Sequence, residues 1–180
     1  AFFDMKKLDH INAEYIKAMT PMAFVEAAEP WLTADDAPYA AANYDRTVAL
    51  ALAEDVQQRV STLAEAPAWL DWLFVDSVDE YDEKAWTKAI VKGKVPDRVL
   101  DDITAALTED DFTDRDRLES VVMGVGTTLS EELDARVMSQ APLRIALTGK
   151  GAGIPLWEAM THLGRDVCLE RIAAARARID

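Results

Sequence analysis

Helical periodicity along nearly the whole chain is the feature that most restricts its fold. Apolar residues recur at three- and four-residue steps near the N-terminus, at Met5, Leu8, Ile11, Tyr15 and Met19. The two-residue alternation typical of strands is scarce, and the sequence contains no Asn-Gly or Asp-Gly hairpin turn. We therefore expect an all-α protein built from about nine or ten short helices.

Proline and glycine divide this pattern into separate helices. Thr20-Pro21 places a capping threonine before a proline at the first helical position, and residues 142–149 and 155–164 each begin with proline and end with glycine. APAWLDWLF, at 66–74, should place its aromatic residues in the core. The predicted helices cover about 4–19, 21–31, 40–63, 82–92, 96–108, 113–128, 130–139, 142–149, 155–164 and 165–179.

Composition indicates an intracellular globular protein. The chain has 180 residues and a single cysteine, Cys168, so it can form no intrachain disulfide and suits a reducing compartment. We expect Cys168 to be a buried structural thiol, because it lies at helical spacing with Ile172 and Ala175. The two histidines are far apart with no cysteine cluster, so no metal site is predicted. No run is long and apolar enough to span a membrane. The chain lacks an initiator methionine, and we expect a piece of a longer protein.

Charge is distributed unevenly. The formal net charge is −14, which by itself disfavours broad binding to nucleic acid. Residues 141–180, however, hold six Lys and Arg against four Asp and Glu, a net +2, whereas residues 1–140 carry −16. We expect an anionic partner to approach the C-terminal quarter.

The glycine-rich stretch TGKGAG, residues 148–153, looks at first like a phosphate-binding loop. A P-loop requires Ser or Thr after its lysine, but Lys150 is followed by Gly151, and the preceding segment has a helical pattern. Two interpretations remain. The segment is a flexible connector between helices, or its backbone approaches a ligand closely because glycine has no side chain in the way.

Arg59 is the most informative single residue outside this stretch. On a helix covering 40–63, it would lie about 20° from Val48, within the apolar stripe. Its side chain either extends to solvent at the helix end beside Glu54 or Asp55, or serves a ligand.

Two blocks of the chain resemble bacterial glutamyl-tRNA synthetases. KKLDHINAEYIKAMTP, residues 6–21, is similar to the segment that leads into their anticodon-binding region. PLRIALTGKGAGIPLWEAMTHLG, residues 142–164, is similar to the PLRxALTG block near their end. The resemblance covers essentially all 180 residues.

The resemblance implies an α-helical cage of two consecutive small bundles. Residues 1–75 would form the end of the stem-contact region plus a first anticodon-binding subdomain, and residues 76–180 a second, with a boundary near 75–81. The family's HIGH and KMSKS signatures are missing, since His10-Ile11-Asn12-Ala13 is not HIGH. This chain should therefore have no catalytic residues and no cofactor of its own. ATP and Mg would belong to the catalytic domain of the parent enzyme.

Several residues inherit roles from the resemblance. Arg144 matches a family position that contacts the anticodon, Gly153 and Pro155 would shape the loop, and Leu156 would press on a base. If VQQRVSTLAEAP aligns in register, Arg59 reads the third anticodon base and separates glutamate tRNA from glutamine tRNA. Lys7 and Lys150 would contact the tRNA backbone.

The resemblance implies tRNA(Glu) and the missing catalytic half as partners. We expect a cytoplasmic protein, with a monomer as the default oligomeric state. The competing hypothesis is an acidic all-helical protein-interaction domain with no RNA role. A complete enzyme of another kind is disfavoured by the lack of a nucleophile or acid–base set.

Overall fold

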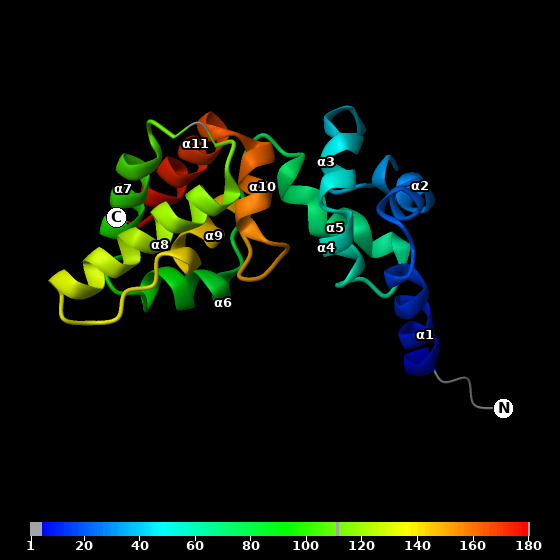
Figure 1. Cartoon of the computed structure of the whole chain (residues 1–180), viewed down its shortest axis with the longest axis horizontal. Coiled ribbons are helices and arrows are strands. Elements are labelled where there is room, and N and C mark those ends of the chain that lie inside the picture. The colour runs from blue at the N-terminus through cyan, green and yellow to red at the C-terminus, as the bar shows by residue number, and fades with distance from the viewer. Residues whose placement is uncertain (1–4, 111, 180) are drawn as a thin grey trace. The chain divides into compact units, whose positions relative to one another are not determined.

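The fold is entirely helical in the part of the chain that can be described. A computed structural model describes residues 5–110 and 112–179 and contains no strand among them, so the all-α prediction is confirmed (Figure 1). The predicted helix start at residue 4 lies outside the described residues. None of the helices in the described ranges is long and apolar enough to cross a membrane.

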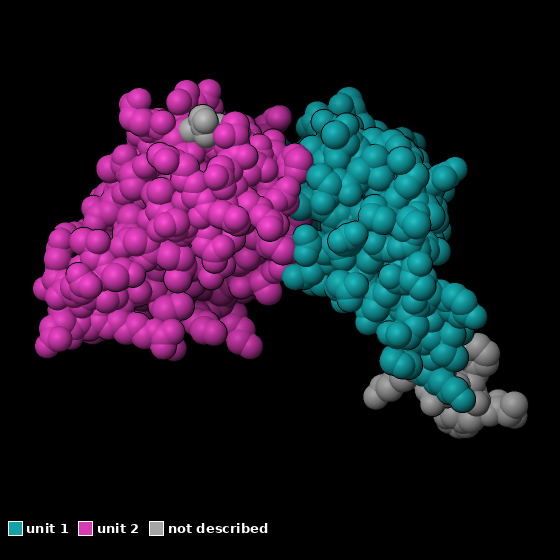
Figure 2. Space-filling model, in the orientation of Figure 1, with its two compact units in different colours: residues 1–75 teal, residues 76–180 magenta. Residues whose placement is uncertain are grey.

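The chain divides into two compact units, one ending at Val75 and the other beginning at Asp76 (Figure 2). The helices of the first unit are α1 (Met5–Lys17), α2 (Pro21–Leu32), η1 (Ala41–Asn43), α3 (Arg46–Ala51), α4 (Ala53–Gln57), η2 (Leu63–Glu65), α5 (Ala66–Leu70) and η3 (Asp71–Leu73). Those of the second are α6 (Glu83–Trp86), η4 (Thr87–Val91), α7 (Pro96–Leu107), α8 (Arg115–Glu132), α9 (Gln140–Thr148), α10 (Leu156–Leu163) and α11 (Arg165–Arg176).

Helix α2 is the centre of the first unit. It begins as predicted, because the Thr20 side chain accepts a hydrogen bond from the Ala23 amide at 3.2 Å and Pro21 occupies the first helical position. Phe24 and Val25 are fully buried. Gln57 is also buried, and its amide nitrogen donates to the carbonyl oxygens of Ile16 and Met19, which joins α4 to the chain just beyond α1.

The predicted long helix over 40–63 is wrong. Asp45 accepts a hydrogen bond from the Thr47 amide at 2.7 Å and starts a new helix, α3, at Arg46. Leu52 has φ −102° and ψ 5°, which separates α3 from α4, and α4 ends at Gln57. The apolar spacing was helical, but it runs across three segments. Arg59 therefore follows a helix end, and its predicted place on an apolar stripe does not exist.

The second unit packs α7, α8, α9 and α11 around a shared core. Leu100, Ile103, Leu118 and Leu143 contribute fully buried side chains. Cys168 is buried as predicted, and burial raises the pKa of its thiol to about 12, so the thiol stays protonated at neutral pH.

One continuous helix replaces the two predicted over 113–128 and 130–139. The Asp114 side chain accepts hydrogen bonds from the amides of residues 116 and 117, and α8 continues from there to Glu132. Asp134 then adopts φ 44°, and residues 133–139 leave the helix. Gly124 and Gly126 do not interrupt α8, although glycine is a weak helix former.

These two glycines provide a matched test of the packing. A Cβ at Gly124 would meet no atom within 4 Å, whereas one at Gly126 would lie 2.8 Å from Ser139 Oγ and 3.3 Å from the Val137 carbonyl oxygen. Gly124→Ala should raise the free energy of unfolding by about 0.5–1 kcal/mol, because alanine favours helix. Gly126→Ala should lower it, because buried residues must shift. Urea unfolding followed by circular dichroism measures both values, and equal stabilisation by the two changes contradicts this packing.

Candidate nucleic-acid interface

The bend over residues 149–155 connects α9 to α10, and it begins at a glycine that no other residue could replace without strain. Gly149 has φ 70°, its amide donates to the Ile145 carbonyl at 2.9 Å, and its own carbonyl accepts from the Asp82 amide at 2.8 Å. A Cβ here would lie 2.4 Å from the Glu80 carbonyl oxygen. The helix end and the start of the bend are thus held against residues 80–82.

The two other glycines of the bend also fit close contacts inside the protein. A Cβ on Gly151 would lie 2.7 Å from Ala85 Cβ, and a Cβ on Gly153 would lie 3.2 Å from Arg144 Nη1. The protein's own atoms therefore fill the space that glycine leaves at these positions. The sequence alone suggests a different reason for these glycines, namely that they leave room for a ligand. Gly151 and Ala152 are nevertheless exposed, so their backbone is accessible from solvent.

Arg144 is linked by hydrogen bonds to both ends of the bend. It projects from α9, is half-buried, and donates from Nη1 to the Ile154 carbonyl oxygen at 3.1 Å. At the start of the bend, the Thr148 hydroxyl donates to the Arg144 carbonyl at 2.8 Å and accepts from the Lys150 amide at 3.0 Å. Arg144 is therefore placed to shape the bend, in addition to any contact that it makes with a ligand.

The remaining predicted residues differ in accessibility. Pro155 directly precedes α10 and is half-buried, as is Lys150, whereas Lys7 on α1 is exposed. Leu156 is only 1% exposed, so in this conformation it presents almost no surface to a base. Trp157 is buried and packs in the core.

Arg59 lies in the first unit, just after α4. Its guanidinium donates to the Asp55 carbonyl oxygen and lies 3.8 Å from the Asp55 carboxylate, with 30% of the side chain exposed. This is the helix-end arrangement beside Asp55 that the sequence left open as one alternative. The structure places Arg144, Lys150, Gly153, Pro155 and Leu156 together in the second unit, and Arg59 and Lys7 in the first.

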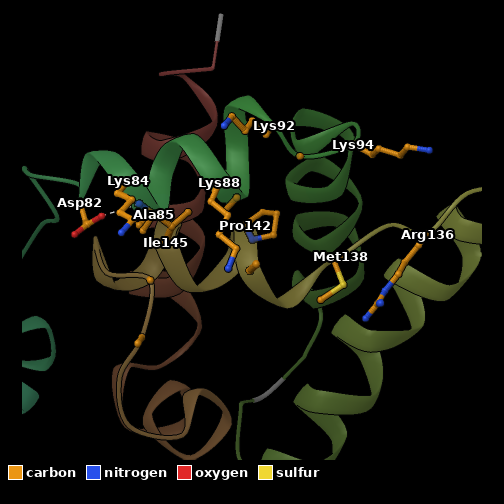
Figure 3. A pocket seen from close by; sticks show the side chains of 15 residues that line it. Asp82, Lys84, Ala85, Lys88, Lys92, Lys94, Arg136, Met138, Pro142 and Ile145 are labelled. Atoms are coloured by element: carbon orange, nitrogen blue, oxygen red, sulfur yellow. Dashed lines mark hydrogen bonds between the residues drawn. The ribbon is translucent and has the colours of Figure 1, made fainter.

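A groove of about 690 Å³ lies beside the bend in the second unit (Figure 3). Its walls come from α6 and η4, from α9 and from Gly151 and Ala152 of the bend. Figure 3 shows Lys84 and Lys88 projecting from the α6–η4 helix beside Pro142 and Ile145, with Arg136 and Met138 at the other end. The charged residues that line the groove are Lys84, Lys88, Lys92, Lys94 and Arg136, with Asp82 as the one carboxylate, so the lining carries a net charge of +4.

Three contacts hold the lysine-bearing helix in place. The Asp82 carboxylate accepts from the Ala85 amide at 2.6 Å and caps α6. Trp86 packs edge-on against Tyr81, with ring centres 4.8 Å apart, and the Arg178 guanidinium lies over the same Tyr81 ring. Burial raises the pKa of Tyr81, so its hydroxyl remains neutral at physiological pH.

Sequence reasoning missed this groove. The segment from Lys84 to Pro96 contains four lysines and no acidic residue, and three of those lysines are spaced by four. The sum over residues 1–140, a net charge of −16, conceals this local group of cations. Arg136 comes close to the lysines only through the packing of the second unit.

Comparisons with known proteins agree with the resemblance. Residues 23–176 match the family model described as an anticodon-binding domain. The glutamate–tRNA ligase of Streptomyces griseus is 39% identical over 179 residues, covering 99% of this chain and 34% of the relative. That of Thermobifida fusca is also 39% identical, over 189 residues, covering 99% of this chain and 37% of the relative. The chain thus spans about a third of the length of these relatives.

A solved structure supports the fold. The glutamate–tRNA ligase of Elizabethkingia meningosepticum superposes with a TM-score of 0.79 at 19% identity, covering 99% of this chain and 33% of that one. The sequence-based assignment is confirmed, and the alternative of a protein-interaction domain with no RNA role is not supported. The chain belongs to the anticodon-binding domain family, in the form that glutamate–tRNA ligases contain.

Proposed function

We propose that this chain recognises the anticodon loop of tRNA(Glu) as the anticodon-reading part of a longer glutamate–tRNA ligase. ATP, Mg and glutamate activation belong to a catalytic domain that the chain does not include. The observation that carries the proposal is the bend over 149–155, which Gly149 and Arg144 hold in one shape within an anticodon-binding domain.

The chemistry of the bend suits single-stranded bases. Anticodon bases are unstacked, so their edges and faces are open to a protein. Gly151 and Ala152 expose backbone donors and acceptors, and Arg144 adds a guanidinium that presents several N–H groups in a fixed fork. Because Leu156 is buried, the exposed backbone is the better candidate for contact with a base.

Arg59 is proposed to read the third anticodon base from the first unit. Its partner Asp55 holds the guanidinium at the end of α4, and the exposed part of the side chain is available to the acceptor edge of a cytosine. Asp55 would then orient the arginine, because a side chain that contacts a ligand needs supporting hydrogen bonds to hold it in position.

The function is tested with two RNAs that differ only in the anticodon. The anticodon stem-loop of tRNA(Glu) and the same stem-loop with another anticodon are titrated with the chain at fixed salt, and binding is followed by fluorescence anisotropy. The first RNA should bind at least about tenfold more tightly, because each base contact contributes about 1–3 kcal/mol. Equal and strongly salt-dependent binding to both contradicts the proposal, because phosphate contacts carry no sequence information.

Arg59→Gln should reduce discrimination between cytosine and guanine at the third anticodon position by about 1–3 kcal/mol, with a smaller change in total affinity. Arg46→Gln is a suitable control, because Arg46 lies in the same unit and pairs with Glu29 at 3.5 Å. Affinities for the two RNAs give the ratio directly. If the preference for cytosine survives the Arg59 change, the register of VQQRVSTLAEAP is misassigned.

Arg144→Lys keeps the charge but loses the forked donor that reaches the Ile154 carbonyl. Affinity for the correct anticodon loop should fall, because lysine cannot present the forked donor that holds the Ile154 carbonyl and faces a base, while the anticodon-altered loop loses less. The same titrations measure both. Full retention of discrimination by the lysine variant would show that only the positive charge of Arg144 matters.

A further inference from the structure

We propose that the basic groove of the second unit is a docking site for the sugar–phosphate backbone of an RNA strand. The groove is the one lined by Lys84, Lys88, Lys92, Lys94 and Arg136 over an apolar floor of Met138, Pro142 and Ile145. This inference rests on the proposed function, since it assigns the groove to the same RNA whose bases meet the bend.

The five cations have no carboxylate partner among the described residues, although the chain has 33 acidic residues and only 19 basic ones. All five are exposed. Other arginines of this unit do pair: Arg98 with Glu132, Arg115 with Glu158 and Arg165 with Asp166. In so acidic a protein, a group of five cations without such partners marks a surface reserved for an external anion.

The spacing of the lysines costs folding energy. Lys84 and Lys88 lie four residues apart on α6 and η4, and Lys92 directly follows η4. Like charges repeated this closely are unfavourable, by about 0.2–0.5 kcal/mol per pair at the i,i+4 spacing of an α-helix. An acidic residue at Lys88 would turn both repulsions into attractions. A polyanion with charges repeated along its length removes the same repulsion when it binds.

The shape of the groove favours a strand over a compact anion. Lys84, Lys88 and Lys92 extend along one helical segment instead of converging on one point, which suits the repeated charges of a strand. The apolar floor suits ribose and base faces. A second hollow of about 260 Å³ shares Arg136 and Met138 with the groove, so the accessible surface continues beyond them.

The groove also shares a wall with the bend. Gly151 and Ala152 line it, and Gly151 lies against Ala85 of the lysine-bearing helix. RNA is therefore favoured over an acidic protein segment, because one strand can place its bases at the bend and its phosphates along the lysines. Under this division of roles, the bend supplies sequence preference and the groove supplies affinity that depends on salt.

The experiment compares two triple variants with the same change in net charge. The groove variant carries Lys84→Gln, Lys88→Gln and Lys92→Gln. The control carries Arg98→Gln, Arg115→Gln and Arg165→Gln, which removes three exposed cations of the same unit that already pair with carboxylates. Circular dichroism confirms folding. Affinities for the tRNA(Glu) anticodon stem-loop and for its anticodon-altered form are then measured over a range of salt concentrations.

The groove variant should bind both RNAs about tenfold or more weakly at low salt, with an unchanged ratio between them. The slope of log K against log salt should become shallower by about 2, because each lost phosphate contact removes about 0.7 for a single strand. The control should change the slope by less than half as much. Equal slopes for the two variants contradict the RNA-binding role of the groove. An acidic glutamate peptide is titrated in parallel, and a groove variant that loses binding to this peptide but keeps RNA binding also contradicts that role.

The same data separate this inference from the proposed function. If the chain discriminates between anticodons but the groove and control variants show the same salt dependence, only the inference about the groove is contradicted. If the chain binds both RNAs equally and the slope becomes shallower in the groove variant alone, anticodon recognition is contradicted and the inference about the groove is supported. A chain that binds neither RNA at the lowest salt contradicts both.

Discussion

The hydrogen bond from the Asp82 amide to the Gly149 carbonyl is the contact on which the candidate surface of the second unit depends. It joins the residue that caps α6 to the glycine that ends α9, at 2.8 Å. The contact requires glycine, because φ is 70° and a Cβ would overlap the Glu80 carbonyl. As a result, the bend starts beside the lysine-bearing helix, and Ala85 can approach Gly151 closely. The bend and the groove are thus two parts of one arrangement.

Net charge alone gives a misleading view of what this protein can bind. The chain carries −14 overall, yet the groove lining carries +4. At physiological salt, exposed charges are largely screened beyond about 8 Å, so an RNA phosphate in the groove responds mainly to the nearby lysines. Acidic surface elsewhere disfavours non-specific contact with nucleic acid, whereas the groove presents cations to an approaching anion. The relevant quantity is where the cations gather, which a sum over 140 residues conceals.

Sequence signals predict structure correctly where the structure depends on residues within a few positions of each other. The cap at Thr20-Pro21, the glycine that ends α9 and the helical class of the whole chain each follow from backbone chemistry within a few residues. The helix predicted over 40–63 failed because a periodic apolar pattern does not reveal a competing cap at Asp45. The interpretation of Arg59 as a charge within an apolar stripe failed with it. Its contact with Asp55, four residues away, was among the alternatives that the sequence offered.

The sequence by itself determined that the chain is helical, where many of its helices begin and end, and, through PLRIALTG, the family to which it belongs. These properties depend on residues close together in the chain. Only the tertiary structure decided that Gly151 accommodates Ala85, that Arg144 holds Ile154, that Leu156 is buried, and that Arg136 shares a groove with three spaced lysines. Such contacts join residues distant in sequence, and the packing of helices around a common core sets their positions.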